Sequence, residues 1–510
     1  MERRAFFKLV GLSAAACATP TLLSGCTPST VVEEETDSDV SSQETFGVAD
    51  QPEVSFNSTT DVLIIGTGVT GLSCALPLLQ AGYQVTLCEK QDKLGGDSYE
   101  SDGIMYVAGS KTQEKAGIKA TASQLWDKRK AQLERENYSE LDFARKLFEA
   151  SGEWADVLAD DCASVFADPK TYSDDGVNEG ILLPKNGIGD MVSVLGPLRD
   201  TLTSLGAVFQ TGYTCCALIS NNKGEICGAR FVSADQGDIK DIRAAYVVMA
   251  TGGFVSSQAL VNAYAPDWVR VGCYTVASDG QGQLLCEGVG GQLSGMDNAI
   301  VLTSDVPAVA AWGLFGPTLD VSPLGERIAP EDTMTASARA CVVAYDGFWW
   351  TIFTNALSEG SQSRSVAQVV SSYKTRTYGP YDDLSALASG CNIPSEQLEK
   401  TFEAYEKMVD DKKDSLGRTS QWVSLEAPYY AFKQIPVRCV THGGVVTDDT
   451  GQVQNAAGQA IVGLYCCGSA AAKGGQGLAS NGAFGMLTGR ALVDKLNERK
   501  SQVEASSSGN

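Results

Sequence analysis

The stretch from Asp61 to Lys90, DVLIIGTGVTGLSCALPLLQAGYQVTLCEK, constrains the fold more than any other part of the chain. It begins with the apolar run VLII, which is short enough for a buried parallel strand. The glycines of a G-x-G-x-x-G pattern follow and lead into an apolar helix pattern that stops near Ala81-Gly82. A second β-rich run extends from Gln84 to Cys88 and ends at Glu89. This order of segments predicts a βαβ unit.

Each glycine of the pattern has a physical role. Gly66 permits the tight turn, Gly68 lets the backbone approach a pyrophosphate, and Gly71 lets the helix pack on the strand. The helix N-terminus offers unpaired N–H groups to phosphates. Glu89 ends the second strand, at the spacing from the glycines where a carboxylate can accept both ribose hydroxyls. The pattern predicts a dinucleotide site, and a purely structural βαβ unit is the alternative.

Length and charge narrow the class of protein. The 510 residues are enough for two or more domains with a large core. A formal net charge of −23 argues against nucleic acid and against an anionic membrane surface as partners. A solvated acidic surface is the simpler meaning of that charge.

The segment from Met1 to Cys26 is predicted to be an export signal rather than part of the fold. The pair Arg3-Arg4 precedes a modest apolar region, which resembles a twin-arginine signal. The segment from Leu23 to Cys26 resembles a bacterial lipobox, so Cys26 would be lipidated and anchor the protein to the membrane. The apolar run is too short for a transmembrane span. We therefore expect the protein at the cell surface or on the periplasmic side of the cytoplasmic membrane; a soluble protein with a chance apolar leader is the alternative.

Residues 27–58 are rich in Ser, Thr, Asp and Glu, which predicts a flexible acidic tether, with ordered structure beginning near Thr59. Two of the 15 cysteines, Cys17 and Cys26, belong to the leader, and the others are irregularly spaced without C-x-x-C or C-x-x-C-H. Most of them are expected to be core residues. No metal site and no c-type haem are predicted, while an iron–sulfur ligand set drawn from scattered cysteines stays open.

A second glycine turn follows the βαβ unit, in KLGGDSYESDGIMYVAGS, where Gly95-Gly96 precede Ser98 and a third glycine, Gly103, comes later. The βαβ fingerprint, the acid that ends its second strand and this G-G-x-S turn together resemble the fumarate reductase-like FAD-dependent oxidoreductases. That superfamily includes succinate dehydrogenase flavoproteins, urocanate reductase and 3-ketosteroid dehydrogenases. The resemblance implies FAD as the cofactor, and it places the hydroxyl of this turn near the isoalloxazine.

Later stretches extend the resemblance to about residue 496. ATGG at 250–253 ends a buried strand, SDG at 278–280 resembles the family's G-D-G segment, and GLYCCGSAAAKGGQGLASNGAFG at 463–485 resembles its C-terminal flavin segment. A β-meander is predicted around a turn at 221–224, and helices are predicted within 118–162 and 187–206. The resemblance places Tyr213 to Cys215 at the adenine and the start of the last helix at the flavin's O2 edge, where the helix dipole stabilises reduced-flavin charge.

The predicted fold class is α/β. It combines a Rossmann-like FAD-binding domain of the glutathione reductase type, a βαβ unit plus a β-meander, with an inserted α+β substrate-capping domain. The predicted order is a signal over 1–26, the tether over 27–58, the FAD-binding domain over 59–291 and 431–496, the capping domain over 292–430, and a flexible tail over 497–510. Within the capping domain, Ser395 is the expected N-cap of a surface helix, and Trp349 and Trp350 are expected in the core.

The residues expected to hold FAD on this resemblance lie in the glycine turns, at the strand ends and at the last helix. They are Gly66, Gly68, Thr70, Gly71, Glu89, Lys90, Gly95, Gly96, Asp97, Ser98, Asp102, Gly103, Cys215, Ala250, Thr251, Gly252, Asp279, Gly443, Gly468, Ser469, Asn481 and Ala483.

Hydride transfer from flavin N5 to an activated alkene needs a group that polarises the acceptor and an acid that protonates the adjacent carbon. In fumarate reductases an Arg supplies the proton, and Arg, His, Thr and Glu side chains hold the two carboxylates. The matching positions here are Thr335 for that Arg, Ala310-Ala311 for the Thr-Glu pair, Cys439 for the His, and 473–476 for the last Arg. Fumarate is therefore not the expected substrate. The ketosteroid dehydrogenase pattern also fails, because no Tyr follows Tyr465.

Two candidates remain for catalysis. Arg339 lies one helical turn past residue 335 and could reach the same space, although a surface Arg or an ion-pair partner is the structural alternative. His442, the only histidine, precedes Gly443-Gly444 beside the expected flavin, so it could be an acid or a flavin contact, or simply a structural histidine. Tyr274 and Tyr430 are weaker candidates, for which aromatic packing is the simpler interpretation.

The sequence thus predicts an exported FAD-dependent oxidoreductase that reduces the activated C=C bond of a small unsaturated molecule other than fumarate. An aromatic enoate, an enone or a steroid-like molecule would fit. An external electron carrier, a membrane cytochrome or a flavin protein, would supply the electrons. The alternatives are a dehydrogenase of the same fold that passes electrons to a quinone, and a flavin-bearing surface binding protein without catalysis.

Overall fold

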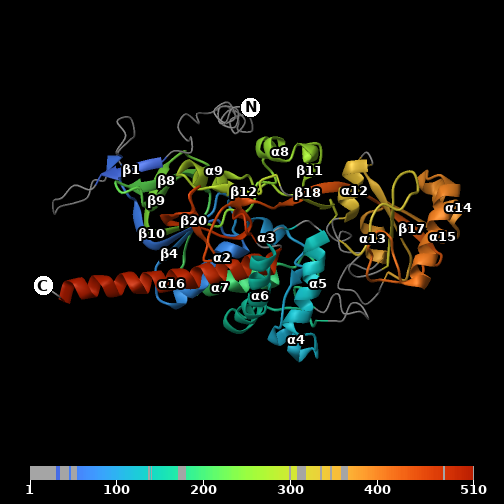
Figure 1. Ribbon diagram of the computed structural model, residues 1–510, viewed down its shortest axis with the longest axis horizontal. Helices are drawn as coiled ribbons and strands as arrows, with labels where there is room; N and C mark the ends of the chain where they lie inside the picture. The colour runs from blue at the N-terminus through green and yellow to red at the C-terminus, as the bar shows by residue number, and fades with distance from the viewer. Residues whose placement is uncertain are drawn as a thin grey trace.

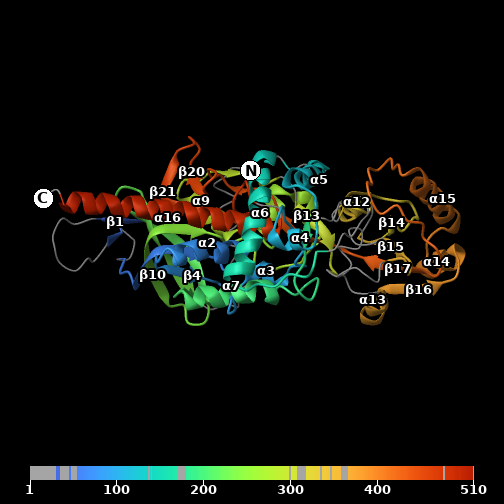
Figure 2. The same cartoon turned by 90° about the horizontal axis from the view of Figure 1, so that it is seen from below.

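The computed structural model describes residues 30–34, 45–46, 54–135, 138, 140–169, 180–297, 300–306, 317–333, 336–344, 347–357, 366–474 and 477–508. The signal expected over 1–26 lies outside these residues. The described elements form two lobes at opposite ends of an elongated molecule (Figures 1 and 2). We call the one built on a ten-stranded sheet the main lobe, and the one built on a four-stranded sheet the cap lobe.

The predicted βαβ unit forms the centre of the main lobe. Ile65 is opposite Cys88 on one side and opposite Met249 on the other, and Met249 is in turn opposite Cys466, all in parallel pairings. Four parallel strands therefore end at one edge of the sheet, which is where open α/β sheets bind ligands. The elements are β3 (Ser58–Ile65), α2 (Val69–Gln80), β4 (Val85–Cys88), β10 (Ile239–Met249) and β21 (Ala460–Cys466), with β7 (Val208–Gln210) beside β4.

The predicted β-meander is confirmed. β8 (Tyr213–Asn221) and β9 (Ile226–Ser233) are antiparallel, and β9 continues antiparallel to the first half of β10. Two short strands, β1 (Thr30–Glu34) and β2 (Thr45–Phe46), lie within the segment predicted as a flexible tether. β1 is parallel to β8, so the tether prediction is wrong for these residues. The β-branched residues of TVV supply strand propensity inside an otherwise acidic stretch.

The last helix, α16 (Leu478–Ser508), packs against α2 and against α6 (Leu141–Asp161). Glycines make this close contact possible, because a Cβ at Gly482 would lie 2.3 Å from Trp154 of α6 and one at Gly485 would lie 2.1 Å from the Thr70 carbonyl of α2. The helix continues through the segment predicted as a flexible tail after residue 496. Its strong helix formers, including an i, i+3 ion pair between Lys495 and Glu498, extend a helix that packing has already nucleated.

Smaller elements of the main lobe surround the sheet edge. The helices predicted within 118–162 and 187–206 are confirmed, and short strands pair near the junction with the cap lobe. These elements are α3 (Gly96–Glu100), β5 (Met105–Tyr106), α4 (Lys111–Lys115), α5 (Ala122–Arg135), β6 (Ile181–Leu182), α7 (Val192–Ser204), α8 (Gln258–Tyr264), η1 (Pro266–Trp268), β11 (Gly272–Cys273), α9 (Gln281–Gly288), β12 (Leu293–Ser294), β13 (Ile300–Ser304), β18 (Pro436–Thr441), β19 (Gly444–Val445), β20 (Gln452–Gln454) and η2 (Gly468–Ala470).

The cap lobe has its own sheet, in the order β14-β15-β17-β16, and its own apolar core. Trp350 and Phe402 lie in that core, and Trp349 is also buried, as predicted for the tryptophan pair. The elements are β14 (Leu319–Val321), β15 (Trp349–Phe353), α13 (Val366–Ser372), β16 (Thr377–Tyr381), α14 (Leu384–Cys391), α15 (Ser395–Asp411) and β17 (Tyr429–Gln434), and α12 (Ala336–Ala344) lies between the two lobes.

Strand pairing places the lobe boundaries differently from the sequence analysis. β12 pairs with β19, and β13 pairs with β18, so the main lobe continues to Ser304 rather than stopping at residue 291. β17 pairs with β15 and β16 through residue 434, so the cap lobe includes residues 431–434. The N-cap prediction for α15 is also wrong. The first intrahelical bond runs from Leu398 N to Pro394 O, so Pro394 is the N-cap and Ser395 is already helical.

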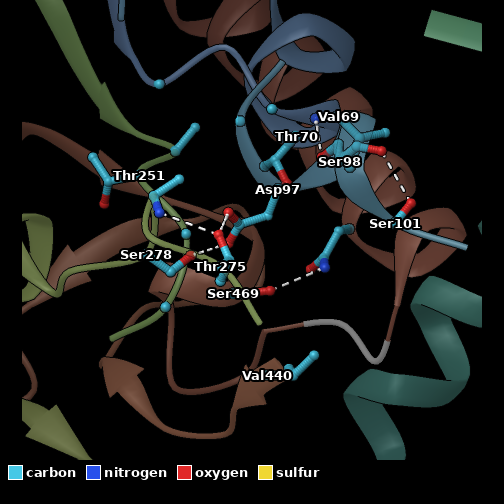
Figure 3. Close-up of a pocket in the computed structure, with 18 of the residues that line it drawn as sticks. Val69, Thr70, Asp97, Ser98, Ser101, Thr251, Thr275, Ser278, Val440 and Ser469 are labelled. Carbon is cyan, nitrogen blue, oxygen red and sulfur yellow. Dashed lines mark hydrogen bonds between the residues drawn. The ribbon is translucent and has the colours of Figure 1, made fainter. Parts of the chain in front are cut away.

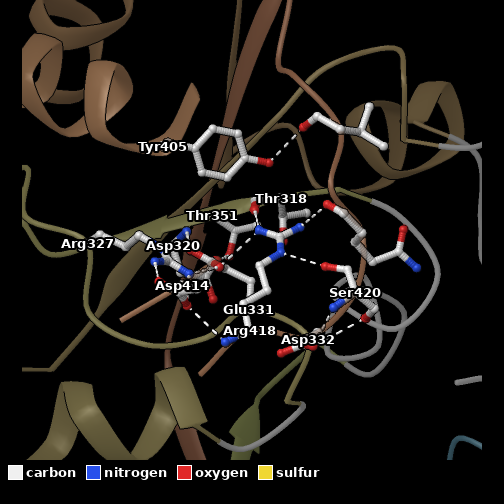
Figure 4. A network of polar contacts seen from close by, with 12 residues as sticks. Thr318, Asp320, Arg327, Glu331, Asp332, Thr351, Tyr405, Asp414, Arg418 and Ser420 are labelled. Atoms are coloured by element: carbon white, nitrogen blue, oxygen red, sulfur yellow. Dashed lines mark hydrogen bonds and ion pairs between the residues drawn. The ribbon is translucent and has the colours of Figure 1, made fainter. Parts of the chain in front are cut away.

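A buried charge network fastens the cap lobe (Figure 4). Glu331 accepts from Arg327 at 2.8 Å and from Arg418 at 3.0 Å, while Arg327 also pairs with Asp414. Arg418 donates further to the carbonyls of Thr318 and of residues 420 and 421. Glu331 and Arg418 are almost fully buried. The network therefore ties the loop after β14 to the loop after α15.

We predict that Glu331→Gln destabilises the protein by about 3 kcal/mol, because it leaves the buried Arg418 without its carboxylate. The free energy of unfolding, from denaturant titration followed by tryptophan fluorescence, measures the effect. Glu149→Gln is the matched control, since the Arg145–Glu149 pair is exposed and should leave the midpoint essentially unchanged. Equal stability of the parent and Glu331→Gln would contradict the prediction.

Candidate functional site

A cavity of about 380 Å³ opens at the edge where the parallel strands end. Its wall combines the glycine turn before α2, the ends of β4 and β10, the α3 loop, the start of α9, β18 and the start of α16. Figure 3 shows residues from these segments converging on it, among them Val69, Thr251, Val440 and Ser469. Segments that lie far apart in the sequence therefore build one site.

The turn after β3 has the geometry that its glycines predict. Gly66 has φ +105°, and a Cβ there would lie 2.3 Å from the Ala250 carbonyl at the end of β10. A Cβ at Gly71 would lie 2.1 Å from the Gly66 carbonyl. No side chain caps α2 at its N-cap residue, Gly68. Ser98 Oγ accepts a hydrogen bond from Val69 N at 2.9 Å, so the G-G-x-S turn lies directly against the N-terminus of α2.

Acidic side chains of the wall are held by donors. Glu89 is buried and accepts from the backbone and hydroxyl of Thr67 and from the Gln91 backbone. Each carboxylate oxygen has two lone-pair directions, so Oε1, which accepts only from Gln91 N, keeps capacity for one ribose hydroxyl. Asp97 bonds to Thr275 and Ser278 on the far side of the cavity, as Figure 3 shows. Lys90 pairs with Asp279 at 2.8 Å.

Two buried polar atoms at the cavity wall have no hydrogen-bond partner among the described residues. Thr251 Oγ1 and Asn481 Oδ1 make no hydrogen bond within the described part of the chain, and both residues line the cavity. The amide nitrogen of Asn481 donates to Ser469 Oγ, which fixes its oxygen as the open acceptor. Such orphaned atoms cost free energy unless a ligand satisfies them. A dinucleotide with a flavin ring carries both donors and acceptors, so these residues and the glycine cradle fit FAD.

The predicted FAD residues divide into two groups. Most of them line the cavity: Gly66, Gly68, Thr70, Glu89, Lys90, Gly96, Asp97, Ser98, Asp102, Gly103, Cys215, Ala250, Thr251, Gly252, Asp279, Ser469 and Asn481. Gly71, Gly95, Gly443, Gly468 and Ala483 lie behind the wall instead. They pack protein against protein; for example, a Cβ at Gly443 would lie 2.1 Å from the Gly295 carbonyl, and one at Gly468 would lie 2.3 Å from Thr70 Oγ1.

The two predicted catalytic residues lie close together but outside the cavity lining. Burial lowers the pKa of His442 to about 3, and the nearby charges of Arg339 and Arg129 add to this effect. The His442 ring meets the edge of Tyr138, whose hydroxyl donates to the Gly474 carbonyl. An imidazole with this pKa is neutral at neutral pH and has no acidic proton to transfer, so the structure does not support the acid role predicted for His442.

The sequence analysis missed Arg129. It is buried on α5 and lines the cavity, with its guanidinium carbon 4.2 Å from the centre of the Tyr106 ring, which also lines it. One signal was available. Leu125, Trp126 and Leu133 form the apolar stripe of α5, and Arg129 stands within that stripe, where a charged residue needs a specific reason.

The other candidates are structural in part. Tyr430 stacks on Phe353 inside the cap lobe, which confirms the packing interpretation. Tyr274 lines the cavity, and its hydroxyl donates to the Glu100 carbonyl. Thr335 and Ala310-Ala311 lie outside the described residues, while Cys439 lines the cavity. The described cysteines are free and most are buried, as predicted for core residues.

Within the described ranges, no cluster of three His, Cys, Asp or Glu side chains is arranged to bind a metal ion. Of the helices in the part of the chain that the structure describes, none is long and apolar enough to cross a bilayer.

We predict that the imidazole signal of His442 in isotope-labelled protein does not titrate between about pH 8 and pH 5, because the native pKa is about 3. His442 is the only histidine, so the NMR assignment is unambiguous. The unfolded chain takes up this proton below about pH 6.5, so the free energy of unfolding should fall as the pH drops from there toward 3. A signal that shifts with a midpoint near 6.5 would show that His442 is not held neutral.

Comparison with known proteins agrees with this geometry. The sequence matches the FAD binding domain family over residues 61–485. It is 25% identical to a probable fumarate reductase of Shewanella frigidimarina, over 85% of this chain and 74% of that protein. It is 22% identical to a vinyl phenol reductase of Lactiplantibacillus plantarum, over 81% of this chain and 90% of that protein.

Among solved structures, a 3-ketosteroid-Δ4-(5α)-dehydrogenase from Rhodococcus jostii has the same fold, with a TM-score of 0.68 and 19% identity over 86% of this chain and 98% of that one. The family match spans most of the chain and includes every segment that builds the cavity. The protein is therefore a member of the FAD binding domain family, a fumarate reductase-like oxidoreductase with FAD as its cofactor.

Proposed function

We propose that this oxidoreductase reduces the activated C=C bond of a small, planar unsaturated molecule that carries one polar activating group. When bound, reduced FAD supplies the hydride. Arg129 is the observation that carries the proposal. It presents guanidinium donors at the cavity wall, where they can polarise a carbonyl, carboxylate or phenolic oxygen of the acceptor.

The charges of the cavity disfavour a dicarboxylate. Among the described residues that line it, the cationic side chains are Lys90 and Arg129, and Lys90 is already paired with Asp279. Glu100 lines the same cavity and would repel a second carboxylate. Cys439 stands where the resemblance expects a histidine clamp. A monoanionic aromatic enoate, a vinyl phenol or an enone fits this balance better than fumarate does.

The ring beneath Arg129 supports an aromatic substrate. Tyr106 contacts the guanidinium group by a cation–π interaction, which reduces the entropy lost when the Arg side chain is ordered by a ligand. The reductase relatives named above include one that acts, by its name, on vinyl phenol. Taken with Arg129 at the cavity wall, this favours an acceptor with one anionic or phenolic end.

We predict that Arg129→Met slows flavin reoxidation by the best acceptor about 100-fold, because one donor to a developing oxyanion is removed. Stopped-flow spectroscopy of the anaerobically reduced holoprotein, with a panel of fumarate, aromatic enoates, vinyl phenols and cyclic enones, measures the rate. Lys130→Met is the matched control, because Lys130 is the exposed next residue of the same helix. FAD content should be equal in all three proteins.

The same experiment discriminates the rivals. If reduced flavin is reoxidised by no alkene while saturated donors reduce a dye, the protein is a dehydrogenase. If neither reaction occurs, it is a flavin-bearing binding protein. A reductase fed by an external cytochrome or flavin carrier should turn over with reduced dyes and not with NADH alone, so efficient NADH turnover would contradict the proposed electron source.

We also propose that the chain is exported and anchored by a lipid at Cys26, on the support of its paired arginines and lipobox-like segment. We predict that Cys26→Ser moves the protein from the membrane fraction to the soluble fraction, while Cys17→Ser leaves it at the membrane. Fractionation followed by immunoblotting measures both. Unchanged membrane association of Cys26→Ser would contradict the anchor.

A further inference from the structure

Asp102 has an unusual position in the cavity wall. It lies between α3 and β5, and its backbone carbonyl accepts from Gly189 N at 2.8 Å. The next residue, Gly103, has φ +77°, and a Cβ there would lie 2.6 Å from Pro184. Only glycine fits at that position, so the path of the chain past Asp102 is fixed on both sides. The side chain of Asp102 is therefore carried on a rigid part of the wall.

Asp102 differs from the other carboxyl groups of the cavity. Glu89, Asp97 and Asp279 are each held by hydroxyl, backbone or ammonium donors, and Glu100 pairs with Lys93. No hydrogen bond or ion pair holds the Asp102 carboxyl group in the parts of the chain that the structure describes. Burial alone raises the pKa of Asp102 to about 7. Asp102 is half-buried at the cavity wall, and a carboxyl group without a partner in such a place is costly, which favours a role with a ligand.

Other cavity groups are poor proton donors at neutral pH. Burial raises the pKa of Tyr274 to about 12, with further contributions from the charges of Asp102 and Glu100. Arg129 is assigned above to polarise the acceptor, a task in which its guanidinium group keeps its protons, and His442 lies outside the cavity lining. A catalytic acid works best when its pKa is close to the working pH. Asp102 is the cavity carboxyl that meets this condition.

We propose that Asp102 is the catalytic acid of the reduction, a proposal that rests on the function proposed above. In this step the π bond of the acceptor breaks and two C–H bonds form. Bound reduced FAD would supply the hydride, and with it both electrons, to one carbon, and the Asp102 carboxyl group gives its proton to the neighbouring carbon. The resulting carboxylate then takes a proton from solvent, and an external carrier would return two electrons to the flavin, which would take a second proton from solvent.

The groups that share the cavity with Asp102 determine its pH dependence. They are Cys88, Glu89, Lys90, Asp97, Glu100, Tyr106, Arg129, Tyr213, Cys215, Tyr274, Asp279 and Cys439. Burial is the cause that raises the pKa of Asp102. The negative charge of a monoanionic acceptor bound beside it would raise this pKa further and help to keep Asp102 protonated until the proton is transferred.

Asp102→Asn tests the proposal, with Asp235→Asn on the exposed turn between β9 and β10 as the matched control. Infrared difference titration of the oxidised holoprotein should show a protonated carboxyl band that disappears near pH 7 in the parent and in Asp235→Asn and is missing from Asp102→Asn. Asp320, whose pKa burial raises to about 6, should give a second band in all three proteins.

Kinetics complete the test. Asp102→Asn should slow reoxidation by the alkene about 100-fold or more, and the decline of the parent's rate above about pH 7 should vanish. Reoxidation by ferricyanide, measured per bound FAD, needs no proton transfer to carbon and should be unchanged. Parent-like alkene kinetics in Asp102→Asn, or an unaltered infrared titration, would overturn the acid role alone. If the parent itself is reoxidised by no alkene, the proposed function fails, and the acid role fails with it.

Discussion

The close approach of two backbones holds the whole site together. The turn after β3 touches the end of β10, so closely that even a methyl group at Gly66 would overlap the Ala250 carbonyl. Because β3, β10 and β21 are in parallel register, this contact fixes where all their carboxyl ends stop. α2 begins at the same turn, and α16 packs on α2 through glycines. The cofactor cradle, the flavin-side helix and the sheet edge therefore depend on one glycine contact.

The fold could be predicted wherever local sequence patterns determine the secondary structure. The single stretch from Asp61 to Glu89 specifies strand, turn, helix and strand, and alternation of apolar and polar residues indicates the meander. The boundary between the lobes could not be predicted, because only Ile435 separates β17 from β18 and no turn residue marks the change of sheet. The sequence analysis ended the C-terminal helix near residue 496, because its last turns are polar. Those turns continue a helix whose first part is stabilised by packing, and the sequence alone does not show that packing.

The site was predictable in its cofactor half and much less in its acceptor half. Glycines and strand-end acids are local signals, whereas the approach of Arg129 to Tyr106 depends on how α5 lies against β5. His442 shows a different limit. Its position beside paired glycines suggested an acid or a flavin contact, but burial, with the charges of Arg339 and Arg129, lowers its pKa to about 3, which does not suit an acid. Charge state is decided by surroundings that a single sequence does not display.

The direct passage from β17 to β18 has a mechanical consequence. β17 is a central strand of the cap sheet, and β18 contributes Cys439, Val440 and Thr441 to the cavity wall. One extended segment thus runs from the cap core to the cavity wall, and Ile435 lies at the junction of its two strands. A tilt of the cap lobe would therefore also move this part of the cavity wall. A cap motion that admits substrate would change the shape of the cavity at the same time.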